Sequence, residues 1–197
     1  MRRRAALAGI GAVALGAAAG CVGRGGSGDP TPSAFSVRGP AFEDDRLPAR
    51  FTCDGAGVSP PLRIERAPPP TAGFAVVATV PISTAEQAPL WLLWDLPPER
   101  REIPAGVPAD PVVSSLGGAR QGRNASGAIG YLPPCPPRGV SEEVWFTVYA
   151  LREPLGLAPG ATRDAVSEAL ESAPLAGRRL VVGYRRPAAT AAEPDDG

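Results

Sequence analysis

Gly130-Tyr-Leu-Pro-Pro-Cys-Pro-Pro-Arg-Gly139 is the stretch that decides how this chain folds. Four prolines flank Cys135, and each proline fixes φ and lacks an N–H donor, so the segment cannot join a sheet ladder. An apolar run, Val144 to Leu151, follows it directly. We therefore expect a stiff loop at the start of a strand, suited to shaping a ligand pocket.

Two upstream motifs have the same loop character. They are Thr52-Cys-Asp-Gly55 and Ser59-Pro-Pro-Leu62. Asp54 precedes a glycine, so its carboxylate has two interpretations: a turn aspartate that bonds its own backbone, or a carboxylate in the wall of a pocket. Together the three motifs indicate a set of ligand loops rather than a catalytic centre.

Short apolar runs predict a β-rich core. Phe74 to Val80 and Leu90 to Leu96 are nearly continuous apolar runs bounded by proline, a pattern typical of central strands covered on both faces. Val144 to Leu151 and Leu180 to Tyr184 are rich in aromatic or β-branched residues and predict two further strands. We expect these strands to form two packed antiparallel sheets.

One helix is predicted, over Arg163 to Ala173. Thr162 can cap its N-terminus, Val166 and Leu170 fall on one face, and Pro174 should end it. The chain is also rich in turn-forming residues, with Gly 24 and Pro 25. The predicted fold class is mainly β, with a short helix near the C-terminus, in one domain over residues 35–186.

Composition argues against several functions. Lys+Arg 20 balance Asp+Glu 20, which gives no reason to expect a nucleic-acid partner. The sequence contains no histidine, so it lacks the usual general base and the commonest metal ligand. We expect no enzymatic activity, no cofactor and no metal.

The N-terminus has the order of an export signal. Arg2-Arg3-Arg4 is followed by small apolar residues from Ala5 to Gly20 and then by Cys21. The lipobox-like Ala18-Ala19-Gly20-Cys21 would make Cys21 the lipidated first residue of the mature chain, and an ordinary cleaved signal is the alternative. This predicts an exported lipoprotein anchored at the outer face of the membrane, with a signal over residues 1–21, a flexible tether over 22–34 and a disordered tail over 187–197.

Cys53 and Cys135 are the remaining cysteines, and in an exported domain they are expected to be oxidised to a disulfide. The alternative is two separate buried thiols. A bond between positions 82 residues apart would stabilise the fold by about 4.5 kcal/mol at most. It would also lock together the two loops expected to form the pocket.

The glycine-rich segment from Gly117 to Gly130 carries two weaker signals. Asn124-Ala-Ser126 is a glycosylation sequon, which would place Asn124 on a surface loop. Arg120 and Arg123 could attract an anion, although exposed loop arginines are more often simply solvated.

The ordered motifs resemble the phosphatidylethanolamine-binding protein family, and more closely its bacterial and archaeal Raf-kinase-inhibitor-like branch. The resemblance covers residues 35–186. It depends on Thr52-Cys-Asp-Gly55, Ser59-Pro-Pro-Leu62, Trp91, Asp95-Leu-Pro97, Gly122-Arg-Asn124, Gly130-Tyr131, Pro134-Cys-Pro-Pro137, Gly139, Phe146 to Leu151 and Gly183-Tyr-Arg185. It implies a β-fold of two antiparallel sheets with a small anion-accepting pocket for phosphorylated head groups at one end. Some family members inhibit kinases or serine proteases.

The resemblance also shows where this chain departs from the family. The family's Asp-Pro-Asp-Ala-Pro segment falls on Val80 to Thr84, so both aspartates are absent. One family histidine falls on Leu90, a second falls near Glu142, and a family tyrosine falls on Val144. A carboxylate at Glu142 would repel phosphate, so we expect an altered anion pocket.

The resemblance leads to a set of expected ligand-binding residues: Asp54, Trp91, Pro134, Pro136, Pro137, Gly139 and Glu142. Trp91 is also a candidate for the core, because it lies inside an apolar strand. We expect a non-enzymatic protein that binds a small apolar or cationic ligand. The alternative is an interaction module that inhibits a serine protease or another envelope protein.

Overall fold

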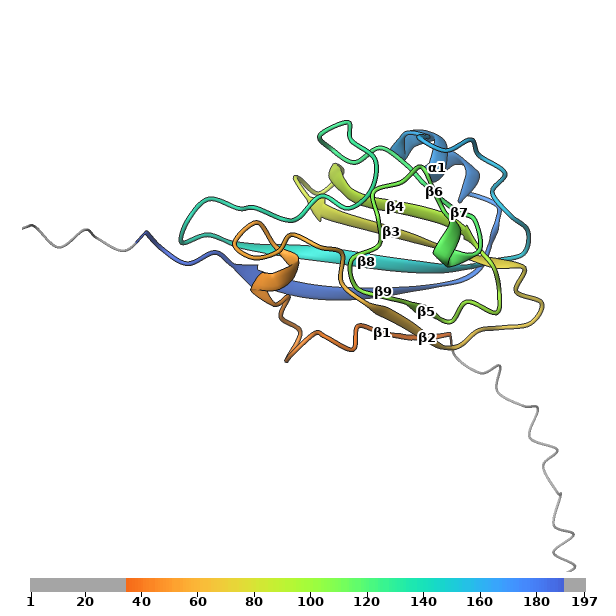
Figure 1. Cartoon of the computed structure of the whole chain (residues 1–197), viewed down its shortest axis with the longest axis horizontal. Coiled ribbons are helices and arrows are strands. Elements are labelled where there is room, and N and C mark those ends of the chain that lie inside the picture. The colour runs from red at the N-terminus through yellow and green to blue at the C-terminus, as the bar shows by residue number, and fades with distance from the viewer. Residues whose placement is uncertain (1–34, 190–197) are drawn as a thin grey trace, which may run out of the picture. The chain divides into compact units, whose positions relative to one another are not determined.

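The computed structural model describes residues 35–189. These residues form two antiparallel β-sheets and one short α-helix (Figure 1). The small sheet has the strand order β1 (Ser36–Arg38), β2 (Leu62–Arg66), β5 (Glu102–Ile103). The large sheet has the order β6 (Val112–Val113), β7 (Ala119–Gln121), β4 (Gln87–Leu96), β3 (Gly73–Pro81), β8 (Ser141–Leu151), β9 (Pro174–Arg185). The predicted fold class is confirmed.

The large sheet is covered on both faces, which explains its continuous apolar strands. On the face toward the small sheet, Phe74, Trp91 and Phe146 belong to the main core. On the opposite face, Trp94 and Leu151 pack with Val166 of α1 (Arg163–Ala169) in a second cluster. Figure 1 shows α1 on the side of the large sheet away from β1, β2 and β5. Because β3 and β4 have apolar neighbours above and below, alternation of polar and apolar residues is absent from them.

The predicted long strands are confirmed as β3, β4, β8 and β9, and β9 is longer than expected. It begins at Pro174 because it pairs with the whole length of β8, from Ser141↔Arg185 to Leu151↔Pro174. Its N-terminal half carries two exposed arginines, so the sequence there has no apolar pattern. The short strands β1, β2, β5, β6 and β7 were not predicted, because two to five residues carry too little periodicity.

The predicted helix is correct at its start and wrong at its end. The Thr162 hydroxyl accepts a hydrogen bond from the Ala165 N–H, as expected of an N-cap. However, α1 ends at Ala169 rather than at Ala173, and Leu170 is the C-cap. Pro174 does not end the helix, since it is the first residue of β9.

The expectation that Arg120 is an anion site or a solvated loop arginine is also wrong. Arg120 lies on β7, and its Nη1 forms an ion pair with Oδ2 of Asp95 at 2.5 Å. The other oxygen of Asp95 accepts the Leu155 N–H at 2.7 Å. This arginine therefore joins a structural network, while 37% of its side chain stays exposed to solvent.

The expectation that Asn124 is a glycosylation site on a surface loop is wrong, because its side chain is buried and hydrogen-bonded. The residue is 7% exposed, and its Nδ2 donates to the Gly130 carbonyl at 3.1 Å. Its Oδ1 accepts from both the N–H and the hydroxyl of Ser126. Because the amide that would carry a glycan holds the loop closed, Asn124 has a structural role here.

The export signal, Cys21 and the tether of residues 22–34 lie outside the described residues, as do residues 190–197 of the predicted tail. Within residues 35–189, no helix has the length and apolar character needed to cross a membrane.

Candidate ligand-binding site

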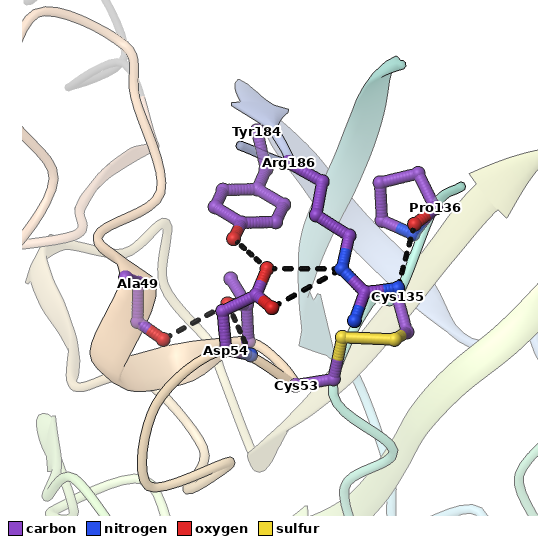
Figure 2. The surroundings of a disulfide bond; sticks show 8 residues. Ala49, Cys53, Asp54, Cys135, Pro136, Tyr184 and Arg186 are labelled. Atoms are coloured by element: carbon purple, nitrogen blue, oxygen red, sulfur yellow. Dashed lines mark hydrogen bonds and ion pairs between the residues drawn. A yellow bond between two sulfur atoms is a disulfide. The ribbon is translucent and has the colours of Figure 1, made fainter. Parts of the chain in front are cut away.

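A disulfide joins the two cysteine-containing loops (Figure 2). Cys53 and Cys135 are bonded, with their Cα atoms 5.3 Å apart. The Cys53 N–H also donates to the Pro134 carbonyl at 3.2 Å. The predicted pairing is therefore present, and the proline-rich loop is held against the Thr52 to Gly55 segment by a covalent bond and a hydrogen bond.

The Asp54 carboxylate binds two side chains from the C-terminal end of β9 and the residue that follows it (Figure 2). The Tyr184 hydroxyl donates to its Oδ2, and the Arg186 Nε lies 3.1 Å from Oδ1 and 3.2 Å from Oδ2. Arg186 in turn donates from Nη1 to the Pro136 carbonyl at 3.2 Å. Asp54 thus connects its own loop, the proline-rich loop and the end of β9.

This arrangement perturbs the titration of both partners. The hydrogen bond from Tyr184, together with Arg186, holds the pKa of Asp54 below its usual value. Burial and the neighbouring carboxylate raise the pKa of Tyr184. The turn interpretation of Asp54 is wrong, because its carboxylate bonds Tyr184 and Arg186 instead of its own turn, and its place in a pocket wall stays a prediction.

Gly139 fixes the proline-rich loop to the same place. Its N–H donates to the Arg186 carbonyl at 3.0 Å, and the Arg186 N–H donates to the Val140 carbonyl at 3.1 Å. Gly139 adopts φ +79°, a left-handed conformation that glycine adopts at little cost. These bonds extend the β8–β9 ladder past its last strand residues and set the position of the loop.

Glu142 lies next to this cluster and is not paired with a charge. It stands directly across the ladder from Tyr184, and alternation along β8 places it on the same face as Val144 and Phe146. Its side chain is half-buried, and removal from water raises the pKa of its carboxyl. Within residues 35–189, no arginine forms an ion pair with it.

Trp91 belongs to the core and not to the ligand-binding set. It has no exposed surface, and its Nε1 donates to Oε1 of Gln121 at 2.6 Å. The Tyr131 ring meets it edge-on at a centroid distance of 6.0 Å. Its predicted place in the pocket wall is therefore wrong, and the core interpretation is correct.

The expected ligand-binding residues differ in burial and lie outside the walls of five cavities in residues 35–189. Pro134 and Pro136 are buried beneath the loop, and Pro137 is exposed. Five cavities in the described part of the chain have none of the seven expected residues in their walls. One of these, of about 230 Å³, includes Tyr184 and Arg46 in its walls and lies along the edge of β9. The structure brings Asp54, the proline-rich loop and Glu142 together at one end of the large sheet.

Sequence reasoning missed three polar residues of this region. Tyr184 and Arg186 lie 130 and 132 positions from Asp54, and Gln121 lies 30 positions from Trp91. No local pattern signals such partners. The only available signal was the motif Gly183-Tyr-Arg185, which contains Tyr184.

The sequence profile of the phosphatidylethanolamine-binding protein family matches residues 38–185. The chain belongs to this family. A UPF0098 protein of Pyrococcus abyssi is 38% identical over 168 residues, covering 85% of this chain and 91% of the relative. A Mycobacterium tuberculosis protein named "Putative lipoprotein LppC" is 32% identical over 156 residues, covering 77% of this chain and 74% of the relative.

Solved structures agree on the fold. Escherichia coli YbcL, described as a member of the mammalian PEBP family, superposes with a TM-score of 0.70 at 24% identity, covering 78% of this chain and 99% of YbcL. Chlamydia trachomatis CT736 gives a TM-score of 0.67 at 28% identity, covering 78% of this chain and 98% of CT736.

Three apolar positions stand where the family resemblance predicts polar side chains. Val80, Leu90 and Val144 stand where the resemblance places an aspartate, a histidine and a tyrosine of the family. They are 8%, 4% and 0% exposed and belong to the main core.

Proposed function

We propose that this protein is a non-enzymatic, extracytoplasmic member of the phosphatidylethanolamine-binding protein family that binds a small cationic or apolar ligand. The observation that carries the proposal is Glu142, a half-buried carboxylate without a charged partner among the described residues. Removal from water already disfavours its ionised form. An ammonium group would supply the missing opposite charge, whereas phosphate would be repelled.

The surroundings of Glu142 support an apolar part in the same ligand. Val144 and Val80 fill the adjacent interior. Val140, which is 45% exposed, lies two residues before Glu142, and Ile82, which is 62% exposed, follows β3 at the same end of the sheet. A small amine with a hydrocarbon portion could therefore make both kinds of contact.

A non-enzymatic role is supported by the use of Asp54. Its carboxylate is occupied by Arg186 and Tyr184, and the hydrogen bond from Tyr184 keeps its pKa low. An effective general base needs a pKa near the working pH, and the sequence provides no histidine to take that role.

Membrane attachment through a lipid on Cys21 is part of the same proposal. The lipobox order of residues 18–21 and the similarity to the relative named as a lipoprotein support it. Mass spectrometry of the membrane fraction should detect a lipid-modified peptide that begins at Cys21. An unmodified mature N-terminus at another residue would contradict this attachment.

The binding proposal is tested by calorimetric titration of the protein with ethanolamine, phosphoethanolamine and inorganic phosphate at matched ionic strength. We expect saturable binding of ethanolamine that is lost in Glu142→Gln. Glu143→Gln is the matched control, because Glu143 is the exposed neighbour on the other face of β8. The cationic assignment would be refuted if the parent protein binds phosphate tightly and Glu142→Gln, which removes the repulsion, binds phosphate more tightly still.

A second candidate is an interaction module for a serine protease or another envelope protein. The exposed Ile82 and Val140 favour it, since a protein partner needs no enclosed cavity. A protease-inhibition assay distinguishes the candidates. Inhibition that Val140→Asp abolishes, in the absence of any small ligand, would support the second one.

A further inference from the structure

A polar cavity lies on the opposite face of the large sheet, beneath α1. Its volume is about 250 Å³, and Val77 and Leu170 supply its apolar lining. Hydroxyl groups enter from the sheet at Thr79, Thr147 and Tyr149, and from α1 at Ser167. The Gln87 amide and three charged residues complete the lining: Arg163, Arg179 and Glu171. This face carries none of the residues expected from the family resemblance to bind a ligand.

Arg163 lines this cavity and has a buried, unused donor beside it. Its Nε is the one buried side-chain nitrogen or oxygen, among the residues that the structure describes, without a hydrogen-bond partner. No described carboxylate forms an ion pair with Arg163. An unpaired buried donor costs about 1–3 kcal/mol, and more when it is charged. Because this nitrogen has almost no accessible surface, the Arg163 side chain must turn toward a ligand in the cavity for the ligand to accept this hydrogen bond and remove that cost.

Arg179, an exposed residue of β9, supplies a second cation. Its Nε donates to the Thr147 hydroxyl at 3.3 Å, and its guanidinium lies 4.4 Å from the centre of the Trp145 ring. These contacts hold the side chain and leave its terminal nitrogens without a hydrogen bond to any described residue. Two arginines and Glu171 give the cavity a net charge of one positive unit, which matches a monoanion.

The size and the hydroxyl groups limit the ligand further. A volume of 250 Å³ corresponds to roughly eight water molecules at about 30 Å³ each. Arginine binds carboxylates through two parallel N–H donors. A neighbouring hydroxyl on the ligand could donate to Glu171 or exchange hydrogen bonds with Ser167, and a short alkyl part could contact Leu170.

We propose that the cavity beneath α1 binds a small monoanionic hydroxycarboxylate, with its carboxylate on Arg163 and Arg179. The site is independent of the Glu142 surface, because the two lie on opposite faces of the large sheet. Lactate is a suitable probe, with propionate as the analogue that lacks the hydroxyl.

The test is a calorimetric or NMR titration of the whole folded protein at constant ionic strength, set with chloride. We expect saturable lactate binding, weaker binding of propionate and at least a tenfold loss of lactate affinity in Arg163→Gln. Arg178→Gln is the matched control, since Arg178 is the exposed neighbour of Arg179 on β9, and it should change the affinity by less than twofold. Glu142→Gln should also leave lactate binding unchanged.

A second variant separates ligand binding from damage to the fold. Glu171→Gln removes the one acid in the lining and should tighten lactate binding about twofold to fivefold, an effect limited by solvent screening. The melting temperature of Arg163→Gln should be no lower than that of the parent protein, because the substitution removes a buried charged donor that has no partner. The proposal is overturned if lactate does not saturate, if Arg163→Gln binds as tightly as Arg178→Gln, or if phosphate binds more tightly than lactate.

Discussion

Removing the disulfide between Cys53 and Cys135 should destabilise the fold by about 2–4.5 kcal/mol. The upper figure follows from the sequence separation of 82, because the cross-link removes loop-closure entropy from the unfolded chain. Residual structure in the unfolded chain lowers the effect, which gives the lower figure. For a domain of this size, about 2–4 °C of melting temperature accompanies each kcal/mol, so the upper figure corresponds to a fall of roughly 9–18 °C.

The assay is guanidinium unfolding followed by tryptophan fluorescence. The test variant is Cys53→Ser with Cys135→Ser, and the matched control is Cys21→Ser, which leaves the pair intact. The denaturant dependence of the free energy should become steeper in the double variant, because an unfolded chain without the cross-link exposes more surface. Unfolding free energies within about 0.5 kcal/mol of the control would refute the reasoning, and reductant added to the control should reproduce the loss.

Three further predictions concern single side chains. Tyr184→Phe removes a hydrogen bond to the Asp54 carboxylate, so the pKa of Asp54 should rise toward its ordinary value in a carbon-13 NMR titration. The lowered pKa of Asp54 stabilises the fold at pH values above the usual value near 3.8, and this stabilisation is lost as pH falls through the native pKa. Tyr184→Phe should therefore lose less stability on acidification, and an unchanged acid response would contradict this. Gln121→Ala leaves the Trp91 Nε1 without an acceptor and should cost about 1–3 kcal/mol or more in chemical unfolding, whereas a neutral effect would show that the buried bond is dispensable. Glu142→Gln should raise the unfolding free energy at neutral pH, because a raised native pKa of Glu142 means that the stability of the parent protein falls as pH rises through that pKa. The gain in stability should vanish below about pH 4.5, and its persistence there would argue for a packing effect.

The sequence predicts the long elements of the fold because their patterns are local. Phe74 to Val80 and Leu90 to Leu96 are apolar over enough residues to identify buried strands. The end of α1 could not be predicted, since β9 begins early in order to pair with Leu151 and this pairing partner is remote in the sequence. Arg120 was misassigned for the same reason, because its partner Asp95 lies on a neighbouring strand 25 positions away.

The candidate site was predicted in part. The pairing of Cys53 with Cys135 followed from export chemistry and from the small number of cysteines. The role of Asp54 could not be predicted, because Tyr184 and Arg186 reach it only after β9 is aligned with β8. The cavity beneath α1 has no motif at all, since its polar groups come from separate strands and a helix.

The central claim is that Glu142, in its apolar surroundings, makes this end of the sheet a receptor for a cation instead of an anion. The most direct measurement is the carbon-13 NMR titration of the Glu142 carboxyl with pH, in the presence and absence of ethanolamine and of phosphate. Ethanolamine should lower the raised pKa of Glu142, because the ammonium stabilises the ionised form, and phosphate should leave that pKa unchanged. A pKa of Glu142 that does not change when ethanolamine is added, or that rises further because phosphate binds beside it, would contradict the claim.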